Sequence, residues 1–144
     1  MISLICKKYG IENYIVNDDG SIDVAGDVYL SHENLTQLPL RFNKVNGGFY
    51  CSNNQLTSLK GCPRWISGGF RCGYNQLTSL EFSPDYVGLW FSCRFNNLTD
   101  NYCDTEIGGR FFTSLKQDGL TEDNYNEWRK LYKRKLILND IFNM

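Results

Sequence analysis

The sequence predicts an α/β repeat protein, a solenoid of short stacked units with a cap at each end. A phrase of 13 residues that starts at Gly47 returns at Gly68, so the chain repeats every 21 residues. Each unit is too short to bury its own apolar side chains and must stack on its neighbours. The segments before and after the repeats follow other patterns, which is typical of the caps that cover the open ends of such arrays.

The composition fits one folded domain. The chain has 144 residues, 15 Lys and Arg against 16 Asp and Glu, and 42% hydrophobic residues. This balance argues against a generally basic nucleic-acid binder, and the apolar content argues against disorder. No stretch approaches the roughly 20 apolar residues of a membrane span, and the first residues do not resemble a secretory signal. We therefore expect a single cytoplasmic domain without a membrane partner, divided into a cap (1–25), repeats (26–113) and a second cap (114–144).

The first cap is predicted to be a helix followed by a hairpin. Residues 2–9 are a helix candidate, and two short apolar segments, 14–16 and 21–24, flank an Asp-Gly turn. Three aspartates in this region raise the question of a calcium site, but Gly20 is misplaced for the loop of an EF-hand. The pattern therefore favours a turn.

Four columns of residues recur through the repeats, with one member in each unit. Because side chains of a strand alternate between its two faces, the first two columns are expected to point inward, and the leucines are expected to close the turn beneath them. Stacked copies then form a parallel sheet along one face. The columns are Val28, Phe49, Phe70 and Phe91; Leu30, Cys51, Cys72 and Cys93; Leu35, Leu56, Leu77 and Leu98; and Thr36, Thr57, Thr78 and Thr99.

An asparagine follows the predicted strand in three of the four units. Asn54, Asn75 and Asn96 occupy equivalent places, and Glu33 replaces them in the first unit. An amide carries both a donor and an acceptor on a short side chain, so we expect these residues to hydrogen-bond to the backbone of adjacent turns. The second half of the unit repeats as well, with the equivalent apolar residues Val45, Ile66 and Val87.

These repeats resemble the leucine-rich repeat family in its short bacterial and bacteriophage form. The family motif L-x-L-x-x-N-x-L-x-x-L is matched by residues 49–59 and 70–80, and less fully by residues 28–38 and 91–98. The resemblance implies a leucine-rich repeat solenoid with a parallel sheet on its concave face, an N-terminal helix and hairpin cap, and a C-terminal helical cap. The chain departs from the motif at Asn101, which stands where a leucine is expected.

The second cap is predicted to be a long helix. A last strand around Phe111 and a linker at residues 116–119 precede it, and Thr121 is a suitable N-cap followed by two acidic residues. Apolar residues then recur near the helical period, so we expect the helix to lie over the end of the repeat core. The stripe comprises Tyr125, Trp128, Leu131, Tyr132, Leu138 and Phe142.

The residue patterns of catalysis and metal binding are scarce. The six cysteines, at positions 6, 51, 62, 72, 93 and 103, could form disulfides or a metal cluster, but three of them occupy an inward strand column, which favours packing as small apolar residues. No C-x-x-C pair occurs, and His32 is the single histidine. The sequence also contains no G-x-S-x-G or P-loop motif. We therefore expect a protein that is not an enzyme and that carries no cofactor and no metal.

The outward residues of the predicted strands are rich in Tyr, Trp and Arg, the residue types enriched at the hot spots of protein interfaces. Cross-strand pairing alone also enriches aromatic residues in sheets, but Trp90 close to Arg94 on a solvated face favours an interface. The predicted partner-binding residues are Tyr29, Tyr50, Arg71, Tyr74, Trp90, Arg94, Phe95 and Phe111.

We therefore expect a module that binds a partner protein on its concave face. The resemblance to phage-type members implies an inhibitor of a host or antiviral-defence protein in the host cytoplasm. A binder of RNA or DNA that uses Arg71, Arg94 and the basic run 129–135 stays open as the alternative, and so does a pocket for a small nucleotide. Charge is segregated, because residues 12–33 contain acids but no Lys or Arg and residues 34–80 contain bases but no acid, so a partner is expected to dock in one orientation.

Overall fold

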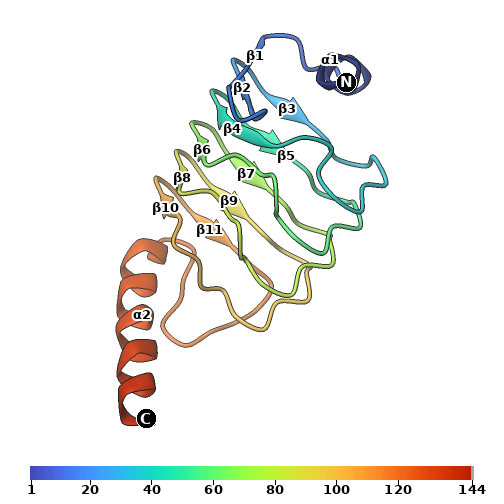
Figure 1. The fold of residues 1–144 in the computed structure, drawn as a ribbon. Helices are drawn as coiled ribbons and strands as arrows, with labels where there is room; N and C mark the ends of the chain where they lie inside the picture. Colours follow the sequence, from blue (N-terminus) through green and yellow to red (C-terminus); the bar gives the residue numbers. More distant parts are fainter. Residues whose placement is uncertain (144) are drawn as a thin grey trace.

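The computed structural model describes residues 1–143, which wind into a β-solenoid with a helix at each end of the stack (Figure 1). Its strands form a six-stranded sheet of order β1-β2-β4-β6-β8-β10 and a five-stranded sheet of order β11-β9-β7-β5-β3. The elements are α1 (Ile2–Lys8), β1 (Tyr14–Val16), β2 (Ile22–Val24), β3 (Val28–Tyr29), β4 (Phe42–Val45), β5 (Phe49–Tyr50), β6 (Trp65–Ile66), β7 (Phe70–Arg71), β8 (Tyr86–Val87), β9 (Phe91–Ser92), β10 (Glu106–Ile107), β11 (Phe111–Phe112) and α2 (Tyr125–Phe142).

The first cap is a helix and a hairpin, as predicted. β1 pairs antiparallel with β2, with Tyr14 opposite Val24, and β2 then pairs with β4 in the parallel part of the sheet. The carboxylate of Asp19 accepts hydrogen bonds from the backbone N–H and the hydroxyl of Ser21 at 2.9 and 2.6 Å. The hydroxyl of Ser21 holds the pKa of Asp19 below its ordinary value. Asp19 therefore acts as a turn residue, which hydrogen-bonds to its own chain two residues on.

The repeats stack in the predicted register. Val28, Phe49, Phe70 and Phe91 are aligned partners in the five-stranded sheet, and all four are fully buried. Neighbouring rings contact along the stack, with centroids 6.1 Å apart for Phe49 and Phe70 and 4.8 Å apart for Phe70 and Phe91. The cysteines two residues after each phenylalanine are buried as well, which confirms their predicted packing role. Burying one such ring stabilises the fold by about 1.5–3 kcal/mol, so this column is a main source of stability.

The return half of each unit is also a strand, which the sequence analysis did not predict. Val45, Ile66, Val87 and Ile107 are aligned partners in the six-stranded sheet, and their side chains are buried. Most of these strands are two residues long, too short to display the alternation by which a strand is recognised in a sequence. The solenoid therefore has two parallel sheets along its length, where the sequence predicted one.

The asparagine ladder forms as predicted. Asn54 Nδ2 donates to the backbone carbonyl of Leu30 at 2.8 Å, and its Oδ1 accepts from the backbone N–H of Leu35 at 3.0 Å. Asn75 and Asn96 repeat this pattern one and two turns further along the stack. Each amide thus ties the end of one strand of the five-stranded sheet to the preceding turn.

The last turn of the solenoid is one residue shorter than the preceding turns. Phe91 pairs with Phe111, which follows it by 20 residues. Phe111 consequently points inward and is 1% exposed, and Phe112 points outward. The prediction that Phe111 faces a partner is wrong, because it assumed an unbroken period, and a shift of one residue reverses the two faces of a strand.

The second cap begins later than predicted. α2 starts at Tyr125 with Asn124 as its N-cap residue, so the prediction of Thr121 as N-cap is wrong. Thr121 donates its backbone N–H to Asn124 Oδ1 at 2.8 Å, and Asn124 Nδ2 donates to the carbonyl of Gly119 at 2.8 Å. These two bonds close the linker into a turn of its own, and the helix can begin only after that turn.

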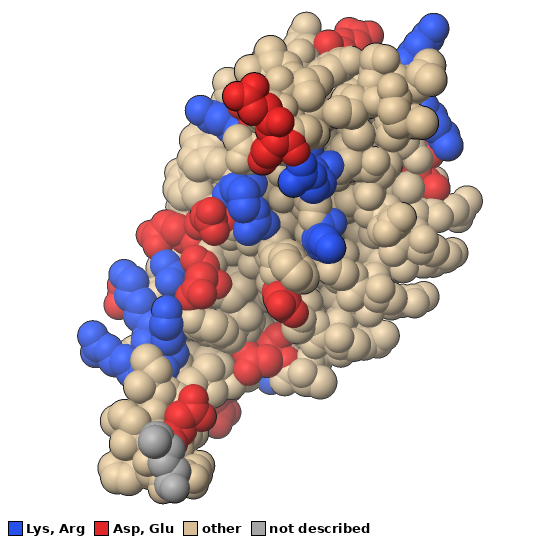
Figure 2. Space-filling model, viewed as in Figure 1, with Lys and Arg blue, Asp and Glu red and all other residues tan. Residues whose placement is uncertain are grey.

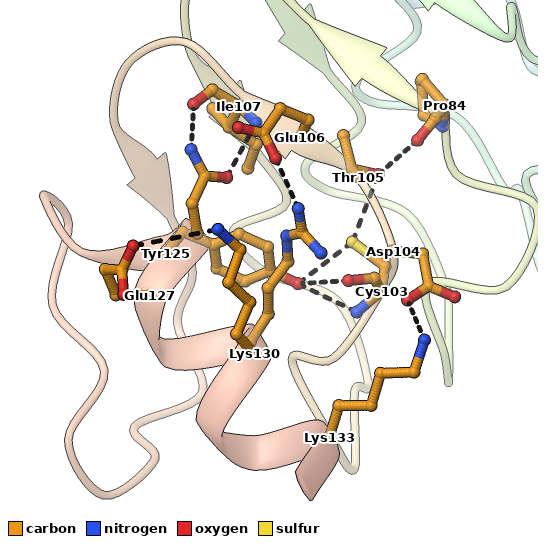
Figure 3. Close-up of polar contacts among 12 residues, drawn as sticks. Pro84, Cys103, Asp104, Thr105, Glu106, Ile107, Tyr125, Glu127, Lys130 and Lys133 are labelled. Atoms are coloured by element: carbon orange, nitrogen blue, oxygen red, sulfur yellow. Dashed lines mark hydrogen bonds and ion pairs between the residues drawn. The ribbon is translucent and has the colours of Figure 1, made fainter.

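Only the first turns of α2 cover the end of the repeat core. Tyr125 and Trp128 are buried, and the hydroxyl of Tyr125 donates to the carbonyl of Asn101 at 2.7 Å and accepts from the backbone N–H of Cys103 at 2.9 Å (Figure 3). Residues 133–143 are exposed and extend beyond the solenoid (Figure 1). The predicted position over the core therefore holds for the first half of the helix only. Neither α1 nor α2 is long and apolar enough to cross a membrane.

Candidate functional site

The outer face of the five-stranded sheet carries a continuous group of aromatic and arginine side chains, which we call the aromatic–arginine face. Seven of the eight residues predicted from the sequence lie in it, and Phe112 stands where Phe111 was expected. The residues next to the inward phenylalanines and cysteines reach this face because strand side chains alternate. Tyr74 and Phe95 follow the inward Cys72 and Cys93 by two residues and reach it because their backbone is left-handed and no longer that of a strand. The aromatic–arginine face comprises Tyr29, Tyr50, Arg71, Tyr74, Trp90, Arg94, Phe95 and Phe112.

One row of rings crosses the strands of this face. Tyr29 stacks on Tyr50 with ring centroids 5.3 Å apart and an interplanar angle of 14°, and the centroids of Tyr50 and Trp90 are 6.2 Å apart. The hydroxyl of Tyr29 donates to the carboxylate of Asp27 at 2.9 Å, and this hydrogen bond raises the pKa of Tyr29. The mutual contacts restrict the rotamers of the rings, so less entropy is lost when a partner covers them.

Two glycines let these rings lie flat on the sheet. A Cβ at Gly48 would overlap the ring of Tyr50, and a Cβ at Gly69 would overlap the ring of Trp90. Both glycines directly precede an inward phenylalanine, at equivalent places in successive units. The repeat thus leaves space on its outer surface for two large rings to lie flat against the backbone.

The two arginines differ in how their charge is compensated. The guanidinium of Arg71 lies 5.0 Å from the ring centroid of Trp90, and no carboxylate of residues 1–143 comes within 4.0 Å of its nitrogens. The guanidinium of Arg94 lies 4.8 Å from the ring centroid of Phe112 and also pairs with Glu122 at 3.3 Å. Arg71 is therefore the arginine that is available to an anionic group of a partner.

Tyr74 and Phe95 occupy strained backbone positions on this face. Their φ angles are 53° and 57°, in the left-handed region, where a residue with a Cβ costs about 1–2 kcal/mol. The equivalent residues of the two preceding units, His32 and Asn53, have φ angles of 60° and 57°. Tyr74 and Phe95 stack with centroids 4.5 Å apart, yet 54% and 55% of their surfaces stay exposed. Strain of this kind is concentrated at functional sites, because elsewhere glycine or asparagine fills such positions at a lower cost.

An open hollow of about 530 Å³ lies between these groups. Arg71 and Trp90 contribute to one part of its wall, and the stacked pair of Tyr74 and Phe95 contributes to another. The backbone of Gly73 is also exposed to the hollow. Such a space can receive an apolar or planar group beside an anionic one.

Phe112 is the functional candidate that the sequence analysis missed. The sequence does contain a signal for Phe112, namely the number of residues between a strand of one sheet and the next strand of the other. An aliphatic residue precedes each inward phenylalanine by four positions. Counting from Ile107 by this rule places Phe111 inside and Phe112 outside. The four pairs are Val45 and Phe49, Ile66 and Phe70, Val87 and Phe91, and Ile107 and Phe111.

The thiols offer little reactivity. All six cysteines are buried and none forms a disulfide, and burial raises the pKa of Cys62 to about 12 and that of Cys51 and Cys93 above its ordinary value. A thiol in such a setting stays protonated and is neither a nucleophile nor a metal ligand. Among residues 1–143, no three His, Cys, Asp or Glu side chains gather in a way that could hold a metal ion.

Comparisons of the chain with protein-family models, with curated proteins and with solved structures find no match.

Proposed function

We propose that this protein is a binding module that holds a partner protein on its aromatic–arginine face. The observation that carries the proposal is the stacked pair of Tyr74 and Phe95, which is more than half exposed although both residues occupy left-handed backbone positions. Two exposed rings at strained positions cost stability without contributing to the core. A partner that covers both rings supplies a favourable free energy of burial, which offsets this cost in the complex.

The rest of the face fits a protein partner. Tyr, Trp and Arg dominate the energetics of protein interfaces because each combines a large contact area with a polar group. Arg71 can bind a carboxylate of the partner, and the neighbouring hollow can receive an apolar side chain. Binding of this kind needs no catalytic group, so we propose a stoichiometric mode of action.

The proposal has a part that rests on the sequence motif alone. We propose that the solenoid is of the leucine-rich repeat type and that the aromatic–arginine face lies on its concave side. The motif resembles short phage-type repeats, and on this ground we propose that the partner is a host or antiviral-defence protein of the cytoplasm and that binding inhibits it.

Nucleic acid is the second candidate partner, because exposed aromatic rings can stack on bases. The charges favour protein instead. Arg94 is paired with Glu122, and two basic residues of α2, Arg129 and Lys133, are paired with Glu106 and Asp104. These pairs leave few cations to follow a phosphate backbone.

The proposal is tested by affinity capture from nuclease-treated bacterial lysate with three tagged baits. The first is the wild type and the second is Arg71→Ala/Trp90→Ala. The third is the matched control Lys44→Ala/Trp65→Ala, which removes a similar pair from the outer face of the six-stranded sheet, where the Lys44 ammonium lies 4.7 Å from the ring centroid of Trp65. Circular dichroism confirms that each bait is folded.

We expect one protein to be captured by the wild type and by the control but not by Arg71→Ala/Trp90→Ala. The affinity of the purified pair should fall by about thirtyfold or more in that variant, because hot-spot residues contribute about 2 kcal/mol each. Equal capture by all three baits would contradict the proposed face. Recovery of nucleic acid, and of no protein, when nuclease is omitted would support the second candidate.

A further inference from the structure

The second half of α2 exposes apolar side chains that the solenoid does not cover. The helix packs against the repeats through Tyr125 and Trp128 and then extends away from them (Figure 1). Beyond these contacts, five large apolar side chains are between 51% and 83% exposed, an unusual density for a single helix. They are Leu131, Ile137, Leu138, Ile141 and Phe142.

These five side chains form one surface, which we call the apolar arc of α2. With 3.6 residues per turn, they fall within about 140° of the helix circumference. On the turns before Ile137 the same sector also holds Glu127, Lys130 and Arg134, so the continuously apolar part of the arc is its C-terminal end, from Ile137 to Phe142. Tyr125, Trp128 and Tyr132, which contact the repeat core or pack against it, lie on the opposite side of the helix. The apolar arc therefore faces away from the solenoid, and a small rotation of the helix would not bury it.

Basic residues surround the apolar arc. α2 contains five Lys and Arg against two acidic residues, Glu127 and Asp140. Figure 2 shows the basic side chains gathered over the middle of the helix, above a mostly uncharged end. By helix geometry Lys133 and Lys135 lie on the two borders of the arc, and Lys130 and Arg134 lie within its angular range on the preceding turns. No carboxylate among residues 1–143 lies within 4.0 Å of Lys135.

We propose that α2 binds an anionic lipid surface and lies in the plane of the membrane interface. An exposed apolar end that adjoins basic residues suits such a surface, since the apolar side chains of Ile137 to Phe142 can enter the acyl boundary and the basic groups of the preceding turns can reach the headgroups. The solenoid is attached to the other side of the helix, so a flat surface can approach the apolar arc without obstruction. The proposal departs from the expectation of no membrane partner, which was based on the absence of a spanning segment, because a helix that lies on the membrane surface needs no such segment.

The same observations disfavour two other occupants. A second copy of α2 would bring the basic residues of two helices together around one apolar contact, and like charges at close range oppose association. Nucleic acid would engage the basic residues but would leave Ile141 and Phe142 exposed. The proposal does not depend on the proposed function, because the two surfaces share no residue.

The test is flotation of the full chain with lipid vesicles. One preparation contains equal parts phosphatidylglycerol and phosphatidylcholine, and the other contains phosphatidylcholine alone. We expect the floated fraction with anionic vesicles to exceed that with neutral vesicles by about tenfold or more, and to fall at high salt, which screens the attraction.

Three variants separate the contributions of the apolar and the basic side chains of α2 to vesicle binding. Ile141→Ser/Phe142→Ser removes apolar surface from the arc, and Arg134→Glu/Lys135→Glu reverses charge beside it; both should lose flotation by about tenfold. Leu4→Ser/Ile15→Ser removes equally exposed apolar residues from the other end of the solenoid and should float like the wild type. All substitutions lie at exposed positions, so the melting temperature of each variant should stay unchanged.

Each contrary outcome overturns the proposal. Equal flotation of the wild type with both vesicle types, or flotation with neither, removes the role of anionic lipid. A sedimentation mass that doubles with concentration in the wild type but not in Ile141→Ser/Phe142→Ser assigns the arc to a second copy. Retention on immobilised DNA or RNA that depends on Arg134 and Lys135 and ignores Ile141 assigns the helix to nucleic acid. Loss of vesicle binding in Arg71→Ala/Trp90→Ala would place the lipid contact on the aromatic–arginine face.

Discussion

The two sheets of the solenoid present outer faces of similar composition and different accessibility. On the six-stranded sheet, Trp65 stacks on Tyr86 with centroids 5.7 Å apart, Lys44 lies over Trp65, and both rings are half-buried. On the aromatic–arginine face, Tyr74 and Phe95 stack more closely and stay more than half exposed on left-handed backbone. Aromatic content therefore does not distinguish the two faces, but exposure and backbone strain do.

The charges distinguish the two faces less clearly than exposure does. On the six-stranded sheet, the carboxylate of Asp23 accepts hydrogen bonds from the Asn43 side chain at 2.9 Å and from the backbone N–H of Lys44 at 3.1 Å, and Glu106 pairs with Arg129. On the other face, Arg71 has a ring beneath it and no carboxylate within 4.0 Å in residues 1–143. Lys44 on the six-stranded sheet likewise lies over a ring with no carboxylate within 4.0 Å in residues 1–143, so each face carries one such cation, and exposure of the rings and backbone strain distinguish the two faces.

The largest expected effect concerns the asparagine ladder, which supports the strand ends of the five-stranded sheet. Asn75→Leu should lower the free energy of unfolding by about 3 kcal/mol, because it leaves the buried N–H of Leu56 without its side-chain partner and removes one of the two amide donors to the carbonyl of Cys51. Urea denaturation measures the loss. Asn97→Leu is the matched control at an exposed position, and its effect should stay within about 0.5 kcal/mol. Similar effects of the two substitutions would show that the ladder adds little.

Replacement of one tyrosine by glycine on each face tests the strain directly. Tyr86→Gly should lower the free energy of unfolding by about 2 kcal/mol, because a half-buried ring is lost and glycine weakens a strand. Tyr74→Gly should change it by less than about 0.5 kcal/mol, because relief of the left-handed backbone offsets the lost stacking. Thermal and chemical denaturation of both variants measure the difference. A loss at Tyr74 as large as that at Tyr86 would mean that the stacked pair serves stability.

The interiors behind the two faces should differ in their response to alkaline pH. Burial raises the pKa of Cys51, Cys72 and Cys93, behind the five-stranded sheet, whereas the buried residues on the strands of the six-stranded sheet are aliphatic or, at Phe42, aromatic and include no thiol. A thiol with a raised pKa in the folded state contributes full stability below its unfolded pKa and loses that contribution as the pH rises towards the folded value. The free energy of unfolding should therefore fall by about 1.4 kcal/mol per buried thiol for each pH unit above about 9.

Urea denaturation near pH 7 and near pH 10, under reducing conditions, measures this loss. Cys72→Ala should lose about 1 kcal/mol less than the wild type between the two pH values. Val87→Ala also leaves a cavity but removes no thiol, so its alkaline loss should equal that of the wild type. An equal alkaline loss in all three proteins would mean that other groups control the response.

Much of the fold follows from the sequence because a repeat converts sequence spacing into spatial contact. The 21-residue period places Phe49 on Phe70 and Asn54 one turn below Asn75, and no other information is needed to align them. The hairpin of the first cap is equally local, since its turn residues lie between the two strands. Five of the eight residues expected on the outer face, Tyr29, Tyr50, Arg71, Trp90 and Arg94, follow from the same period together with strand alternation, whereas Tyr74 and Phe95 reach that face through their left-handed backbone.

The tertiary structure decided the features that depend on neighbouring turns. Three of the six strands of the six-stranded sheet, β6, β8 and β10, are two residues long and exist because adjacent turns supply their hydrogen-bond partners, so no local pattern marks them. The shortened last turn decided that Phe111 is buried and that Phe112 points outward and is half-buried, and the side chain of Asn124 decided where α2 begins. The tertiary structure also decided how exposed each side chain of the outer faces is and whether its charge is paired. Periodicity gives the face on which a side chain lies, whereas only the packed neighbours determine how much of it is covered and whether its charge is matched.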